Sequence, residues 1–144
     1  MKNPEAFRLQ SAEKVYMTVT MTTSNRGGHS SIPRPDNAIY ELADAIKKVE
    51  AYKFPISLNE TTRATLEFAL NQDQENVRGE IIAILDGETE SEFDMVNNNS
   101  AVNAILRTTC VATQLTAGHA ENALPVSATA TVNCRVLPLS LIHI

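Results

Sequence analysis

The chain has 144 residues, 43% hydrophobic and 20% charged, with 12 basic against 17 acidic side chains and a formal net charge of -5. This length and composition are typical of one globular domain that is large enough for a core, which excludes disorder along the whole length. A pI near 5.1, without any block of Lys or Arg, argues against a nucleic-acid partner. Because no apolar run approaches the ~20 residues of a membrane span and no signal peptide is visible, we expect a soluble protein of the cytoplasm or the periplasm.

The first predicted element is a strand from Lys14 to Thr22, because apolar and polar residues alternate there. It should be half-buried, with one apolar face made of Val15, Met17, Val19 and Met21. The following run from Ser24 to Gly28 ends the strand, since its two glycines permit a tight turn and a close approach of other atoms. A loop is expected from there to Pro35.

A helix is expected to follow, with Asp36 as its cap. Its apolar positions recur with the 3.6-residue helical period and are Ile39, Leu42, Ala43, Ile46 and Val49. After a break at Pro55 the sequence predicts three further helical pieces, which run from Asn59 to Leu70, from Gln74 to Leu85 and from Ser91 to Leu106. These pieces form an inserted helical cluster over about residues 59–106.

Strands return in the last third of the chain, from Thr108 to Thr116 and from Ser127 to Leu137. In the second of these strands, polar residues alternate with apolar residues, which are Ala128, Ala130, Val132, Cys134 and Val136. The segment from Ala117 to Val126 suits a structured loop better than a two-residue hairpin turn. The order of strand, helix, helical insert, strand and strand predicts an α+β fold.

The cysteines and histidines form no recognisable metal or redox motif. Cys110 and Cys134 are interpreted as two small buried thiols, because they lack the close spacing of a zinc or redox pair. His29, His119 and His143 are scattered, so no metal site is expected in this chain. No Ser-His-Asp arrangement can be argued either, so Ser30 is not expected to be a nucleophile.

Three places remain as candidate functional residues: the run Gly27-Gly28-His29-Ser30-Ser31, the run Asn122-Ala123-Leu124-Pro125, and Arg135. Each is weak evidence by itself. A single His in a Gly-rich loop is more often a packing or surface residue, and most strand arginines are solvated or paired on the surface.

Taken together, the runs N-R-G-G-H-S-S-I-P-R-P-D-N-A-I-Y-E-L-A-D-A-I and E-N-A-L-P-V-S-A-T-A-T-V-N-C-R closely resemble one family. It is the lid, or dimerisation, domain of the M-twenty zinc metallopeptidases, relatives of aminoacylase, carboxypeptidase G and succinyl-diaminopimelate desuccinylase. The resemblance implies an antiparallel sheet with helices on one face, occupying residues 14–138. Residues 1–13 would be the end of a crossing from an absent catalytic domain, and the last helix and strand of the lid would be missing.

The resemblance also implies a function: hydrolysis of peptide or N-acyl amide bonds next to a free carboxylate. Two zinc ions would lie in the absent catalytic domain and none in this chain, which alone should be inactive. His29 would stabilise the oxyanion in the partner subunit's active site, a task that suits an N–H donor worth about 3 kcal/mol. Asn122 and Arg135 would bind the substrate carboxylate, for which a guanidinium offers two parallel hydrogen bonds. His119 is a further substrate-contact candidate, although a local structural role is favoured.

Such a lid would also form a homodimer, through the helix from Asn37 to Tyr52 and an adjoining strand. Residues 139–144 read L-S-L-I-H-I, which a common sequencing adapter would encode, so we expect a non-native tail in which His143 is not a ligand. Two alternatives stay open: a stand-alone small α+β ligand-binding module, and a pure dimerisation module without substrate contact.

Overall fold

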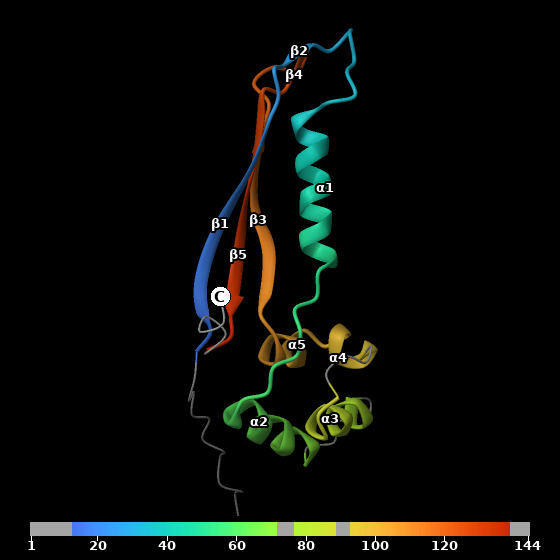
Figure 1. Cartoon of the computed structure of the whole chain (residues 1–144), viewed down its shortest axis with the longest axis vertical. Helices are drawn as coiled ribbons and strands as arrows, with labels where there is room; N and C mark the ends of the chain where they lie inside the picture. The colour runs from blue at the N-terminus through green and yellow to red at the C-terminus, as the bar shows by residue number, and fades with distance from the viewer. Residues whose placement is uncertain (1–12, 72–76, 89–92, 139–144) are drawn as a thin grey trace, which may run out of the picture. The chain divides into compact units, whose positions relative to one another are not determined.

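The structure is a computed structural model that describes residues 13–71, 77–88 and 93–138 (Figure 1). The chain divides into two compact units. The first, here called the sheet unit, consists of Tyr16–Phe54 and Thr108–Val136. The second, the helical unit, is formed chiefly by Pro55–Arg107.

The sheet unit is built on three long strands, β1 (Val15–Ser24), β3 (Thr109–Ala117) and β5 (Ser127–Val136). Their order is β1-β5-β3, with β3 antiparallel to β5, and β1 and β5 also run in opposite directions (Figure 1). Helix α1 (Ala38–Ala51) lies along one face and packs against β5 and β3. The predicted α+β fold with an antiparallel sheet is therefore confirmed.

The central strand β5 has the alternation that its sequence predicts. All five of its apolar positions are buried, and they form two neighbouring clusters beneath α1: Ala128 and Ala130 with Ala38 and Leu42, and Val132, Cys134 and Val136 with the partly buried Val49. The polar residues between them point to the opposite face, because successive side chains of a strand alternate. This single strand thus supplies the larger part of the sheet unit's core.

The cap of α1 corrects one prediction. The side chain of Asn37, not that of Asp36, accepts the hydrogen bond from the Ile39 N–H, at 2.9 Å. Asp36 is instead paired with the guanidinium of Arg34. The expected apolar stripe was also too wide, because Ile39 and Ala43 are exposed while Leu42 is buried.

The apolar face of β1 is less covered than its alternation suggests. Met21 packs against both clusters beneath α1, but Met17 and Val19 on the same face are 39% and 40% exposed. The reason is that α1 packs on β5 and β3, so its cover does not extend along the edge strand β1. The strand that the pattern predicts as half-buried is therefore partly buried at one end only.

The prediction of two free thiols is wrong, because Cys110 and Cys134 form a disulfide. The two residues lie directly opposite each other in the antiparallel register of β3 and β5, with their Cα atoms 4.1 Å apart. Their separation of 24 residues hides this proximity in the sequence. The bond joins the edge strand β3 to the central strand.

The helical unit contains α2 (Glu60–Leu70), α3 (Arg78–Leu85), α4 (Asp94–Asn98) and α5 (Ser100–Leu106). The helix expected from Gln74 begins at Arg78, and residues 74–76 lie outside the described residues. The single helix expected from Ser91 to Leu106 is two helices, with residues 91–92 outside the description. Asn99 breaks it, because its extended backbone ends α4 while its side chain caps α5.

Two kinds of contact hold these helices together. An apolar cluster fills their interior and includes Ile56, Leu66, Val77, Ile81, Ile84, Phe93, Val96, Val102 and Leu106. At the ends, the Glu80 carboxylate accepts hydrogen bonds from the first backbone N–H groups of α4, while Arg63 and Arg78 donate to carbonyls at the ends of α3 and α2. Neighbouring helices thereby satisfy one another's unpaired termini. Within the described ranges, no helix has the length and apolar content needed to cross a membrane.

The disulfide is expected to stabilise the sheet unit substantially. A cross-link over 24 residues removes unfolded-state entropy worth about 3.5 kcal/mol. Replacing both cysteines by alanine, or adding a reductant, should therefore lower the free energy of unfolding in urea by about that amount. The double alanine variant is the control, since a reductant should leave its midpoint unchanged; a wild-type midpoint that is equally insensitive to reductant would contradict the disulfide.

Candidate functional site

Two loops meet at one end of the sheet unit, which we call the tip and define as residues 25–36 and 118–126. The short strands β2 (Gly28–His29) and β4 (Ala123–Leu124) pair there, with His29 opposite Ala123. The Ser30 N–H donates to the Asn122 carbonyl at 3.0 Å, and the Asn25 N–H donates to the Val126 carbonyl at 2.8 Å. Both segments were expected to be loops, and this pairing, which brings His29 and Asn122 together, was not predicted from the sequence.

Gly27 makes the close approach of the two loops possible. Its φ of +72° lies in the left-handed region, which favours glycine. A Cβ added there would lie 2.8 Å from Val126 Cγ1 and 3.4 Å from the Leu124 carbonyl oxygen. The first glycine of the Gly-Gly pair is thus required both by its backbone angle and by the space available.

The imidazole of His29 is exposed and is oriented by Ser31. The Ser31 N–H donates to His29 Nδ1 at 3.2 Å, and Ser31 Oγ lies 2.8 Å from the same nitrogen. Because a backbone N–H can only donate, Nδ1 must be the acceptor, and the neutral ring then carries its proton on Nε2. The arrangement therefore presents an N–H donor on the exposed side of the ring.

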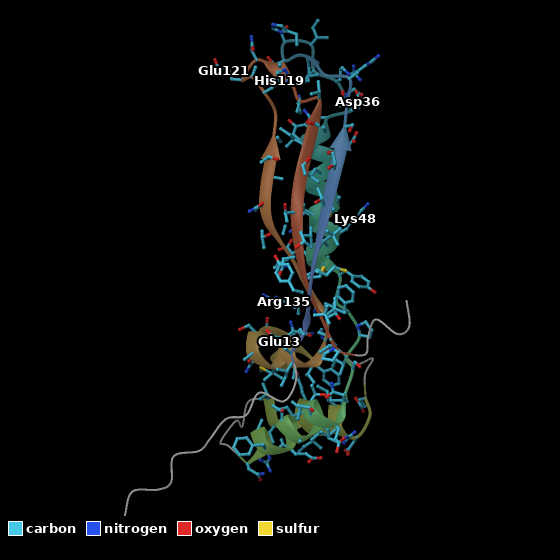
Figure 2. All side chains as sticks on the ribbon, turned by 90° about the vertical axis from the view of Figure 1, so that its left-hand side faces the viewer. Glu13, Asp36, Lys48, His119, Glu121 and Arg135 are labelled. Atoms are coloured by element: carbon cyan, nitrogen blue, oxygen red, sulfur yellow. A yellow bond between two sulfur atoms is a disulfide. The ribbon has the colours of Figure 1, made fainter. Side chains whose placement is uncertain are left out.

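The second loop of the tip carries Asn122 and His119. Both residues are exposed, and Asn122 accepts from Ser30 through its backbone, which leaves its side chain on the surface of the tip. Figure 2 shows His119 together with Glu121 at this end of the sheet. His119 thus lies in the same loop as Asn122, as the sequence indicates.

Arg135 lies at the opposite end of the sheet unit (Figure 2). It sits near the end of β5, on the face away from α1, with its Cζ 4.8 Å from the centroid of the Tyr16 ring, a cation–π geometry. Between Ser127 and Arg135 the strand extends by roughly 26 Å, at about 3.3 Å per residue. The structure therefore brings His29 and Asn122 together but separates both from Arg135.

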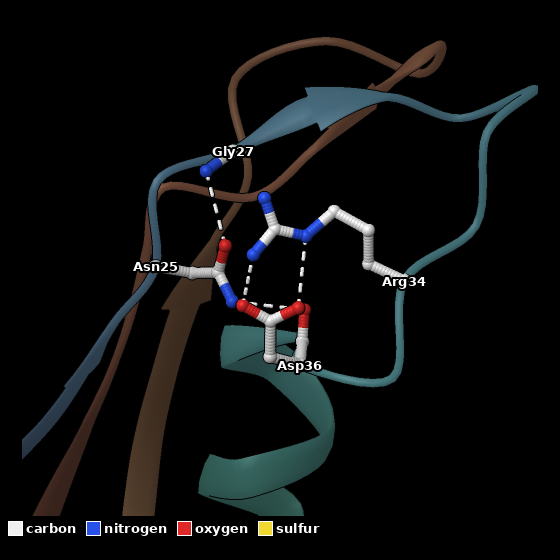
Figure 3. Close-up of polar contacts among 4 residues, drawn as sticks. All are labelled: Asn25, Gly27, Arg34 and Asp36. Carbon is white, nitrogen blue, oxygen red and sulfur yellow. Dashed lines mark hydrogen bonds and ion pairs between the residues drawn. The ribbon is translucent and has the colours of Figure 1, made fainter.

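The base of the His29 loop contains a cluster of polar contacts, shown in Figure 3. Asn25 Nδ2 donates to the Asp36 carbonyl at 2.8 Å, and Asn25 Oδ1 accepts from the Gly27 N–H at 3.1 Å. Arg34 Nε donates to Asp36 Oδ1 at 2.8 Å, and a terminal nitrogen of Arg34 pairs with Oδ2. The hydrogen bonds from Arg34 are the main cause that holds the pKa of Asp36 below its ordinary value, so this carboxylate is charged at neutral pH.

Asn25, Arg34 and Asp36 were not predicted from the sequence as part of the site. Part of this cluster has a readable signal, because Asn two residues before Gly is typical of a turn in which the side chain accepts the backbone N–H. The pairing of Arg34 with Asp36 has no comparable signal. Alternate charged residues around Pro35 are common in loops, and their geometry follows only from the folded backbone.

The described donors do not assemble into a zinc site. Among residues 13–71, 77–88 and 93–138, no three or more His, Cys, Asp or Glu side chains are grouped so that they would hold a metal ion. A structural zinc needs four such ligands and a catalytic zinc three. What the described residues do offer is an N–H donor and amide at the tip and a guanidinium at the far end of β5.

The sequence matches the Peptidase dimerisation domain of the M20 class over residues 11–141. This match covers most of the chain, and the chain belongs to that family.

The curated relatives are considerably longer. The chain is 31% identical over 126 residues to "Probable carboxypeptidase S-like 2" of Dictyostelium discoideum, which covers 88% of this chain and 24% of that protein. It is 32% identical over 130 residues to human "N-fatty-acyl-amino acid synthase/hydrolase PM20D1", covering 88% and 25%. The chain thus spans about a quarter of the length of the curated relatives it matches.

Among solved structures, the chain is similar to the M20 family metallo-carboxypeptidase Sso-CP2 from Sulfolobus solfataricus. The TM-score is 0.46 at 19% sequence identity, over 87% of this chain and 35% of that one.

Substitution of Gly27 should disrupt the tip more than substitution of a glycine with the same backbone angle in open space. Gly118 has a φ of +73° with no atom near its absent Cβ. We expect Gly118→Ala to cost about 1 kcal/mol of unfolding free energy through its backbone alone, and Gly27→Ala about 3 kcal/mol because the Cβ also overlaps Val126. Urea unfolding of both variants measures this difference, and equal costs would argue against the tight packing of the two loops.

Proposed function

We propose that this chain is the lid portion of a longer hydrolase that cleaves peptide or N-acyl amide bonds next to a free carboxylate. Membership in the family of peptidase dimerisation domains supports this, as do relatives named as a carboxypeptidase and as an N-fatty-acyl-amino acid synthase/hydrolase. The zinc ions that such an enzyme uses would be bound outside the described residues. The contribution of this chain is then to bind and orient the substrate and to stabilise developing charge.

The observation that carries the proposal is the hydrogen bond from the Ser31 N–H to His29 Nδ1. It leaves the neutral imidazole with its proton on Nε2, at an exposed tip that two paired loops hold in place. Attack on an amide carbonyl produces an oxyanion, and a donor that is already oriented stabilises that charge without reorganisation. In this proposal His29 is the oxyanion donor.

Asn122 and Arg135 then act in different sites, which refines the pairing suggested by the sequence. One substrate carboxylate cannot contact both residues of the same chain, because β5 separates them by roughly 26 Å. We propose that the tip, with His29 and Asn122, extends over the active site of the partner subunit. Arg135 binds the substrate carboxylate in the site of its own subunit through two parallel hydrogen bonds.

Such a composite site needs a two-fold dimer, and the exposed side of α1 with the edge strand β3 is the surface we propose for it. Ile39 and Tyr40 are exposed on α1 although both are large and apolar. β3 is an edge strand beside them, since the sheet order is β1-β5-β3 and α1 packs on β3. The same surface would meet itself in the partner, as two-fold symmetry requires. The Cys110–Cys134 bond favours an oxidising compartment for this assembly.

His29→Ala in the complete enzyme should lower kcat about 100- to 1000-fold, with a smaller change in KM. The reason is that the lost donor acts mainly on the charge of the transition state. Steady-state kinetics with an N-acyl amino acid substrate measures the effect, and metal content is the control, since it should not change. An unaltered kcat would remove His29 from the reaction.

Mixing two impaired variants, assayed at a substrate concentration well below KM, tests whether His29 acts across the dimer. A hybrid of His29→Ala and Arg135→Ala subunits contains one site with both groups intact and one with neither. After subunit exchange, an equal mixture should therefore recover about a quarter of the wild-type activity. No recovery despite demonstrated exchange would show that both residues act within one subunit's site.

Arg135→Ala should raise KM for carboxylate substrates at least 10-fold more than for the corresponding amides. The guanidinium contributes a charge-assisted, bidentate contact that an amide cannot match. Parallel kinetics on the two substrate forms measures the ratio. If KM rises equally for both, the carboxylate is bound elsewhere.

A further inference from the structure

The loop that carries His29 is closed at its base by a single amide side chain. This loop comprises residues 25–36, from the end of β1 to the residue before the α1 cap. Asn25 donates through Nδ2 to the Asp36 carbonyl at 2.8 Å, and so joins the first residue of the loop to the last. Its Oδ1 accepts from the Gly27 N–H, so the same side chain also holds the turn that leads to His29.

Arg34 adds a second connection. Its guanidinium makes a two-point contact with the Asp36 carboxylate, the geometry in which such pairs are strongest. The Arg34 and Asp36 side chains are 19% and 44% exposed, against 73% and 66% for the Lys47–Glu50 pair on the surface of α1. The Arg34 side chain also lies beside Gly28, where an added Cβ would be 4.0 Å from Arg34 Cδ. The stem of Arg34 therefore lies near Gly28, in the strand β2 that contains His29.

Besides these contacts, the loop is ordered by the backbone pairing of β2 with β4, whereas apolar packing contributes little. Ile32, its one large apolar residue, is 70% exposed, so apolar burial contributes little to the loop's conformation. A segment of twelve residues nevertheless loses considerable chain entropy when it adopts one conformation. The polar contacts at the base offset this loss together with the pairing of β2 with β4.

We propose that Asn25, Arg34 and Asp36 form a clasp that positions His29. The clasp touches no substrate; it closes the loop so that the His29 ring and the Ser31 donor keep their relative placement. This inference rests on the proposed function of His29, but its structural part is measurable without catalysis. Nothing in the family match assigns a role to these three residues.

The structural test uses the 144-residue chain and amide hydrogen exchange at Ser30, whose N–H bonds to the Asn122 carbonyl, and at Ser31. Arg34→Met keeps much of the side-chain stem but removes the ion pair. Exchange at both amides should become about 10-fold faster, as expected when one or two hydrogen bonds that close the loop are lost. The matched control is Arg63→Met in the helical unit, which makes the same change of charge and should leave these two amides unchanged.

Asp36→Asn is a second variant that keeps the backbone carbonyl bound by Asn25 and removes only the charge. It should give the same direction of change as Arg34→Met, and combining the two should add little to either alone, because both remove one interaction. Amide exchange within α1 monitors the fold in every variant. A variant that unfolds α1 is thereby recognised and replaced by Arg34→Lys, which keeps the charge and should restore part of the protection.

In the complete enzyme, Arg34→Met should lower kcat about 10-fold while KM changes less, since a misplaced donor weakens mainly transition-state binding. If His29→Ala leaves kcat unchanged, the proposed function fails, and the exchange data still test the clasp. If His29→Ala lowers kcat but Arg34→Met changes neither kcat nor exchange at Ser30 and Ser31, the clasp is overturned and the proposed function stands. Faster exchange with an unchanged kcat would also overturn it, because the clasp would then order the loop without positioning His29 for the reaction.

Discussion

The regular geometry of β5 is the constraint on which the rest of the sheet unit depends. Its alternation directs five apolar side chains toward α1 and directs Arg135 to the opposite face. Its length then sets how far the tip lies from that arginine. A single strand therefore builds the core, exposes one candidate binding residue and spaces it from the others. Helix α1 covers one face of β5 and leaves these side-chain directions unchanged.

The tip is ordered by different means from the core beneath it. Its two loops are joined by backbone pairing of β2 with β4 and by side chains that bond to the backbone, while most of its residues are exposed. Such contacts are directional, so they define the placement of a side chain such as His29 better than apolar packing of the same small area. They are also accessible to water, so each contributes little by itself. This combination suits a surface that must be shaped correctly but also meet a substrate.

How much of this was predictable follows from what each signal encodes. Periodicity predicts the strands and α1, because burial on one face leaves a pattern, and the two runs that resemble the family indicate which loops are candidates for function. Capping is less predictable, since Asp36 and Asn37 are adjacent and equally capable of it. The pairing of Cys110 with Cys134 requires the strand register, which a bulge between Ala112 and Gln114 makes unreadable from spacing. The exposure of Met17 likewise depends on whether α1 covers the edge strand β1, which the alternation within β1 does not indicate.

The separation within the candidate site could be predicted from the sequence, because the alternation from Ser127 to Leu137 already indicates a strand. Asn122 and Arg135 are only thirteen residues apart in the chain, but β5 occupies most of the segment between them. An extended strand is the most effective separator that a short sequence can provide, because each residue adds about 3.3 Å. For both residues to contact one substrate, one of them must come from a second copy of the chain that is held in a fixed position relative to the first. A two-fold axis provides such a relation, and it converts the separation within one chain into proximity between two. The rigidity of β5 would then be part of the chemistry, since bending it would move the tip away from the site that it completes.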